Sequence, residues 1–218
     1  MESSKYIEDL ASIKTMMSKS SRFMSLSGLS GILAGVYALT AAAVAHYLIQ
    51  GHIQLFAEKN DSIAKVFTRI FASAELAGDL ILLFILTLVL AICTGIILTL
   101  KKAKRNDEGI WDTSSKRLVA NFAIPLFTGG AFCIVLIQYG IVGLIAPATL
   151  IFYGLALVNA SKYTLGDIKY LGLTNIIIGL IATQFIGYGL YFWAVGFGVC
   201  HIVYGAIMYR KYDRVQNP

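Results

Sequence analysis

Long apolar segments, separated mostly by short polar connections, constrain this chain more than any other feature. The hydrocarbon core of a bilayer is crossed by roughly 20 apolar residues in an α-helix, and the chain holds six segments of about that length. Hydrophobic residues make up 57% of the sequence and charged residues 14%, with a mean hydropathy of +0.73. A soluble domain is nearer a quarter charged. Because so few charges cannot cover so much apolar material, a bilayer is the expected solvent.

The expected fold is therefore an all-α, polytopic bundle of six transmembrane helices. Residues 1–23 are expected to form a cytoplasmic amphipathic helix, 24–209 the transmembrane domain and 210–218 a cytoplasmic tail. The six spans are predicted at about 24–47, 78–100, 118–138, 144–160, 168–185 and 189–209.

Lysine and arginine are distributed unequally between the two sets of connections. If the spans alternate in direction, fifteen basic residues fall on the side of the two termini, and three, Lys59, Lys65 and Arg69, fall on the other side. Basic residues near the ends of spans are retained in the cytoplasm. Both termini are therefore predicted to be cytoplasmic. This distribution also accounts for the net charge of +6, so nucleic acid is not an expected partner.

Two segments outside the spans carry apolar side chains at helical spacing. The first, residues 3–22, also carries four basic residues, so it is expected either to lie on anionic lipid headgroups or to pack against the cytoplasmic loops. The second, residues 63–71, lies in the long connection 48–77. It is expected to be an interfacial helix or an extension of the second span.

Small residues in the first span indicate a helix-packing face. Gly31 and Gly35 form a GxxxG step, and Ser27 lies one turn earlier. Small residues allow two helix backbones to approach closely in lipid. An internal packing face is favoured here over a dimer face.

A weak internal pattern connects the spans that end in the cytoplasm. Ile151–Gly154 and Ile202–Gly205 share the pattern Ile-x-Tyr-Gly, and both precede a Lys-Tyr pair. The second span has a similar end, with Thr94-Gly95 before Lys101-Lys102. This pattern predicts three parallel helical hairpins around an axis along the membrane normal, as in some transporters. The alternative is chance recurrence of glycine and basic residues at span ends.

The candidate ligand site lies at the expected mid-membrane depth. Pro125 removes the hydrogen bond to the carbonyl of Asn121, and freed backbone groups in a membrane must be satisfied by protein or by a polar cavity. His201, an ionisable residue inside a span, is a functional candidate by default. The cavity candidates are Asn121, Thr128, Gly129, Gly130, Tyr153 and His201. The alternatives are a kink satisfied by neighbouring helices and a histidine that hydrogen-bonds another helix.

A second polar group is expected near the outer interface. It comprises His46, His52, Glu75 and Asp79, at the end of the first span and the start of the second. Histidine with carboxylates suits a divalent cation or a proton, whereas solvation at the interface is the simpler explanation. No cofactor is expected, and the three cysteines, all in apolar segments, are interpreted as small hydrophobic residues.

Four stretches carry a resemblance that covers nearly the whole chain: Ser20–Gly31, Asn121–Gly130, Gly143–Thr164 and Trp193–His201. They resemble an uncharacterised family of small bacterial multi-pass membrane proteins. The resemblance implies a six-span protein of the bacterial inner membrane and assigns no site residues. Names of some members suggest a carotenoid-cleaving oxygenase, a chemistry whose iron is held by four histidines, and this chain has three.

Three functional hypotheses follow. The first is transport of a small solute or ion, which predicts a polar cavity beside Thr128, Gly129, Tyr153 and His201. The second is a non-catalytic sensor, regulatory module or partner subunit, which predicts a packed interior. The third is a membrane enzyme acting on a lipid or isoprenoid, which predicts converging histidines and carboxylates. Membrane lipid is an expected partner in each case, together with a second copy of the chain or another membrane subunit.

Overall fold

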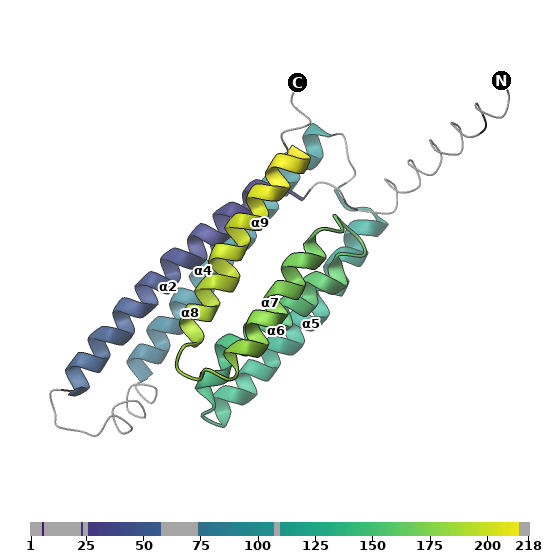
Figure 1. The fold of residues 1–218 in the computed structure, drawn as a ribbon. Coiled ribbons are helices and arrows are strands. Elements are labelled where there is room, and N and C mark those ends of the chain that lie inside the picture. The colour runs from purple at the N-terminus through teal and green to yellow at the C-terminus, as the bar shows by residue number, and fades with distance from the viewer. Residues whose placement is uncertain (1–5, 7–22, 24–25, 58–73, 107–109, 214–218) are drawn as a thin grey trace.

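The structure, a computed structural model, describes residues 6, 23, 26–57, 74–106 and 110–213. The described residues form six helical rods that run alongside one another (Figure 1). The first five rods are α2 (Gly28–Ala57), α4 (Ala74–Arg105), α5 (Thr113–Gln138), α6 (Ile145–Ala160), preceded by the short 3-10 helix η1 (Val142–Leu144), and α7 (Ile168–Ala182). The sixth is continuous and consists of α8 (Gly189–Trp193), the π-helix η2 (Ala194–Val199), α9 (Cys200–Met208) and the π-helix η3 (Tyr209–Asp213). The predicted all-α fold is confirmed.

Five helical segments are long and apolar enough to cross a membrane. They are Gly28–Gln54, Glu75–Arg105, Thr113–Gln138, Val142–Ala160 and Gly189–Asp213. The remaining helix, α7, is apolar but has 15 residues, which gives a length of roughly 22 Å against a hydrocarbon core of about 30 Å. The chain is therefore a multi-pass helical membrane protein, and the membrane crossing of α7 stays a prediction.

Several helices extend beyond their predicted limits, α2 and α4 the furthest. α2 continues from residue 47 to Ala57, and α4 begins at Ala74 and ends at Arg105 rather than residue 100. The apolar stripe predicted at 63–71 lies outside the described residues. So does the amphipathic helix predicted within 1–23, apart from Tyr6 and Phe23.

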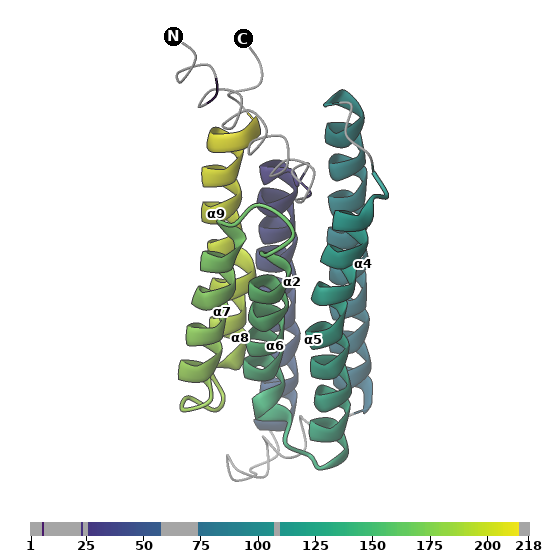
Figure 2. The same cartoon turned by 90° about the vertical axis from the view of Figure 1, so that its right-hand side faces the viewer.

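The six rods are arranged as two groups of three. α2 packs between α4 and α9, and α6 packs between α5 and α7. Contacts of α8, η2 and α9 with α6 and α7 join the two groups (Figures 1 and 2). The principal neighbour of α7 is thus α6, and that of α9 is α2. The predicted repeat of three hairpins stays a prediction.

The described basic residues gather at one end of the bundle. This end contains the end of α4, the start of α5, the α6–α7 connection and η3 (Figure 2). All lysines and arginines of the described residues lie there: Lys101, Lys102, Lys104, Arg105, Lys116, Arg117, Lys162, Lys169, Arg210 and Lys211. We call it the basic end.

Glycines allow the backbones of two helix pairs to approach closely. A Cβ atom added to Gly35 would lie 2.6 Å from the carbonyl oxygen of Gly198, and one added to Gly31 would lie 3.2 Å from the Cα of Gly205. The structure thus places Gly31 and Gly35 on the face of α2 that contacts η2 and α9. In the other group, a Cβ on Gly154 of α6 would lie 2.5 Å from the carbonyl oxygen of Gly172 of α7.

Candidate functional site

His201 lies inside the bundle, and both of its ring nitrogens contact protein atoms. Its Nδ1 is 2.9 Å from the carbonyl oxygen of Gly196, and its Nε2 is 2.7 Å from the hydroxyl of Tyr153. A carbonyl oxygen only accepts hydrogen bonds, so in the neutral ring Nδ1 carries the hydrogen and Nε2 accepts from Tyr153. This assigns one tautomer to His201 and makes Tyr153 the donor.

The π-helix η2 positions this contact. Its last turn is wide enough that the N–H of Cys200 bonds to the carbonyl of Val195 rather than to that of Gly196. The His201 ring supplies the donor for Gly196 instead. π-Helical turns inside α-helices frequently occur at functional sites, and here the turn delivers a backbone carbonyl to a buried histidine.

Aromatic rings surround the Tyr153–His201 hydrogen bond. The Tyr153 ring centroid lies 4.9 Å from that of Phe197 and 6.0 Å, edge to face, from that of Phe122. The ring of Phe197 also stacks on that of His201 at 5.9 Å. The cluster of Phe122, Tyr153, Phe197 and His201 joins α5, α6, η2 and α9. It packs the junction between the two helix groups.

The carbonyl freed by Pro125 has a partner on the next helix. The side-chain amide of Asn159 in α6 donates a hydrogen bond of 3.0 Å to the main-chain oxygen of Asn121. The Asn121 side chain in turn donates to the carbonyl of Arg117 at 2.8 Å. The structure thus places α6 against the interruption in α5.

Three candidate residues one turn beyond Pro125, Thr128, Gly129 and Gly130, face different ways. Thr128 is exposed and donates to the carbonyl of Ile124 in its own helix at 2.8 Å. Gly129 is buried against Phe152, whose side chain occupies the space that a Cβ would take, whereas Gly130 is exposed. Successive residues of a helix cannot share one face, so the structure does not bring Thr128 and Gly130 to the Tyr153–His201 contact.

The four residues of the predicted outer group have separate surroundings. His46 is exposed, with its ring 5.9 Å from that of Tyr191, and His52 contacts the carbonyl of Leu48 in its own helix. Glu75 and Asp79 are exposed. Among the residues that the structure describes, no three of His, Cys, Asp or Glu are grouped so as to hold a metal ion.

Apolar residues join the ends of α2 and α4 instead. Leu76 of α4 is 1% exposed and packs against Leu48, Ile49 and Ile53 of α2. The two helix ends do meet, as the long connection allows. This contact buries leucine and isoleucine side chains, whereas the carboxylates of Glu75 and Asp79 stay exposed.

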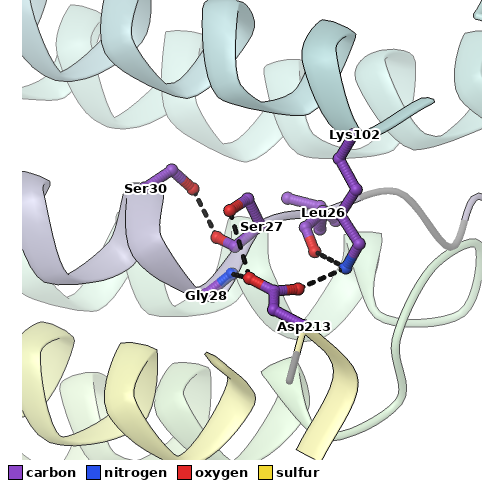
Figure 3. Close-up of polar contacts among 6 residues, drawn as sticks. All are labelled: Leu26, Ser27, Gly28, Ser30, Lys102 and Asp213. Carbon is purple, nitrogen blue, oxygen red and sulfur yellow. Dashed lines mark hydrogen bonds and ion pairs between the residues drawn. The ribbon is translucent and has the colours of Figure 1, made fainter. Parts of the chain in front are cut away.

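A buried ion pair at the basic end was not anticipated from the sequence (Figure 3). The Lys102 ammonium lies 2.5 Å from Oδ1 of Asp213, and the two side chains are 6% and 9% exposed. Lys102 also donates to the carbonyl of Leu26 at 3.0 Å. The other Asp213 oxygen, Oδ2, accepts from the Gly28 N–H at 3.0 Å and from the Ser27 hydroxyl at 3.2 Å. In the sequence, Lys102 is only one member of a basic run, so nothing there distinguishes it.

A second ion pair at the same end is more exposed. Oδ2 of Asp167, which precedes α7, accepts from the Lys211 ammonium at 2.5 Å and from the Tyr212 hydroxyl at 2.9 Å. The hydrogen bond from Lys211 is the largest influence that lowers the pKa of Asp167 below its ordinary value. These contacts tie η3 to the α6–α7 connection.

The α6–α7 connection also holds the chain that leads into α2. The Phe23 N–H donates to the carbonyl of Tyr163 at 2.8 Å, and the Thr164 hydroxyl donates to the carbonyl of Phe23 at 2.6 Å. Thr164 and the adjacent Leu165 are almost completely buried. Both helix groups are therefore joined at the basic end by backbone and side-chain bonds.

Two buried polar atoms have no hydrogen-bond partner among the described residues. They are Oδ1 of Asn175 in α7 and the hydroxyl oxygen of Tyr204 in α9. Asn175 is fully buried and lies against Gly196, where an added Cβ would be 2.7 Å from Oδ1. Buried polar groups without partners are uncommon in folded proteins.

No protein-family model, curated protein or solved structure matches the chain. The family resemblance in its sequence therefore stays a prediction.

Proposed function

We propose that this protein is a six-span membrane module that acts as a sensor, regulatory or partner subunit and does not itself conduct a solute. The observation that carries the proposal is that both ring nitrogens of His201 bind protein atoms, Gly196 and Tyr153. The residue best suited to a ligand at mid-membrane depth is thus used to connect two helices, as polar residues often are in membrane bundles.

The surroundings of Pro125 support the same proposal. A solute path needs polar groups that face a cavity, but the Asn121 carbonyl binds Asn159 and the space beside Gly129 is filled by Phe152. Thr128 bonds to its own helix. Two of the features expected beside a path thus contact a neighbouring helix, and the Thr128 hydroxyl is bound within α5, which supports a packed module.

The position of the basic residues supports an orientation. All described lysines and arginines lie at the basic end, where η3 and the start of α2 also lie. Basic residues that flank spans are retained in the cytoplasm. We place the basic end, with both termini, on the cytoplasmic side of the bacterial inner membrane, and we include α7 as the sixth span.

Transport of a small solute or ion is the second candidate. It is favoured by Asn175 and Tyr204, whose buried oxygens accept no hydrogen bond from the described residues. A path that used them would run between α7 and α9 and not beside Thr128.

A flux assay in proteoliposomes separates the two candidates. The purified full-length chain is reconstituted, and passage of protons, potassium and chloride is followed with trapped fluorescent indicators, in parallel with protein-free vesicles and with Asn175→Leu. Module function predicts the same flux in all three preparations. A flux that appears with the wild-type chain and is lost in Asn175→Leu would establish transport and contradict the module.

A further inference from the structure

Asp213, in η3, caps the start of α2. The N–H groups in the first turn of an α-helix have no partner within the helix, and an acidic or hydroxyl side chain just before the helix usually binds one of them. In α2 the Gly28 N–H is bound by Asp213, which is 185 residues away in the sequence. The local hydroxyl, that of Ser27, donates to the same carboxylate.

Lys102 fixes this carboxylate in place. Its ammonium bridges Asp213 Oδ1 and the carbonyl of Leu26, so α4, the residues before α2 and the end of η3 meet at one point (Figure 3). Removing one partner of a buried ion pair leaves an uncompensated charge, which is strongly destabilising. The position of each of these three segments is therefore stabilised by its contacts with the other two.

We propose that Lys102 and Asp213 form a C-terminal latch, in which the carboxylate of the last helical rod caps α2 and the ammonium of α4 holds that carboxylate. The latch couples the end of the sixth rod to the start of the first. Displacing η3 uncaps α2 and leaves Lys102 without its counterion in the same movement. This inference does not depend on the proposed function.

The Asp167–Lys211 pair provides a matched comparison. It also involves η3, but Lys211 and Asp167 are 55% and 30% exposed, and neither contacts the start of α2 through a described bond. Exposed ion pairs contribute little to stability and are screened by salt. The two pairs therefore differ in burial and in whether a helix end depends on them.

Amide hydrogen exchange on two charge-neutral variants tests the capping role. Lys102→Met with Asp213→Asn removes both buried charges but keeps a side-chain oxygen that can accept from Gly28, whereas Lys102→Met with Asp213→Ala removes that oxygen. Loss of a cap of typical strength predicts roughly five- to tenfold faster exchange at the start of α2 in the Ala pair than in the Asn pair. Asp167→Asn in the wild-type background is expected to leave this exchange unchanged. Equal exchange in the two pairs would overturn the latch.

A charge exchange tests the direction of the latch. Lys102→Asp with Asp213→Lys restores two opposite charges, but the new ammonium would face the Gly28 N–H and the new carboxylate would face the Leu26 carbonyl. The latch predicts that this variant melts below the Lys102→Met, Asp213→Asn pair. A melting temperature restored to that of the wild type would show a simple ion pair without a capping role and would overturn the proposal.

Discussion

The Tyr153 hydroxyl lies 2.7 Å from Nε2 of His201, and this hydrogen bond connects α6 to α9 across the junction of the two helix groups. On the other side of the ring, Nδ1 of His201 donates a hydrogen bond to the carbonyl oxygen of Gly196. Since a carbonyl cannot donate, the Tyr153 hydroxyl is the donor to the neutral ring.

Tyr153→Phe removes the donor to His201 while keeping the aromatic ring. The buried Nε2 then has no partner, which is expected to cost about 1–2 kcal/mol. Denaturant unfolding in detergent measures this loss. Tyr139→Phe is the matched control, because Tyr139 is 77% exposed at the end of α5. A loss no larger than that of the control would show that the hydrogen bond does not hold the helices together.

Asn159→Leu removes the donor to the Asn121 carbonyl, and Pro125→Ala supplies a backbone N–H that can replace it. Asn159→Leu alone is expected to destabilise the fold by about 1–2 kcal/mol. In the Pro125→Ala background the same substitution is expected to cost roughly 1 kcal/mol less, because the carbonyl regains an intrahelical partner. A double-mutant cycle of unfolding free energies measures the difference, and strict additivity would contradict the assigned contact.

Gly35→Ala places a Cβ against the backbone of the final rod, 2.6 Å from the Gly198 oxygen and 2.9 Å from the Ile202 nitrogen. Neither backbone atom can move aside without shifting a helix, so a loss of about 1–3 kcal/mol in the free energy of unfolding is expected. Gly95→Ala is the control, since its Cβ would meet nothing within 4 Å. That control is expected to be neutral or stabilising, because alanine favours helix over glycine. Similar losses in both variants would contradict the close α2–η2 packing.

Asp167 makes a pH-dependent contribution to stability. Its pKa is lowered, chiefly by the hydrogen bond from Lys211, so the folded state favours the ionised carboxylate. The resulting stabilisation is complete above the ordinary carboxyl pKa and is lost as the pH falls through the lower pKa of the folded state. Because both side chains of the ion pair are partly exposed, solvent screening keeps this contribution small.

Melting temperatures recorded between about pH 6 and pH 3 measure this contribution. The wild-type curve should fall more steeply with acid than that of Lys211→Met, which lacks the main cause of the shift. Parallel curves for the two proteins would contradict the assignment of the ion pair.

Hydropathy was sufficient to predict which segments form helices, because a long apolar segment can be identified without knowing which helices it contacts. Helix ends were less predictable. α4 continues through Lys101–Arg105 beyond the apolar segment, where Lys102 turns inward and pairs with Asp213. That pairing joins residues 111 positions apart, and no local pattern in the sequence reports such a contact.

The candidate site was predicted in part. Tyr153 and His201 were named individually from their polarity in apolar segments, and the structure brings them together. Thr128 and Gly130 were grouped with them only because they are near Pro125 in the sequence, but the helical turn directs them outward. Which helix contacts which depends on the close approach of glycines such as Gly35 and Gly198, a pairwise property that a single sequence does not display.

The junction between the two helix groups is expected to be packed and to exclude water. Labelling of single cysteines with a membrane-impermeant maleimide tests it most directly, in a chain whose Cys93, Cys133 and Cys200 are replaced by alanine. Leu150→Cys introduces a thiol at a fully buried position on α6 beside Gly196. Lys162→Cys introduces one at an exposed position at the basic end. With reagent on both sides of the membrane, we predict rapid labelling of Lys162→Cys and none of Leu150→Cys. Labelling of Leu150→Cys at a rate comparable to Lys162→Cys would reveal a water-filled interior and contradict the account.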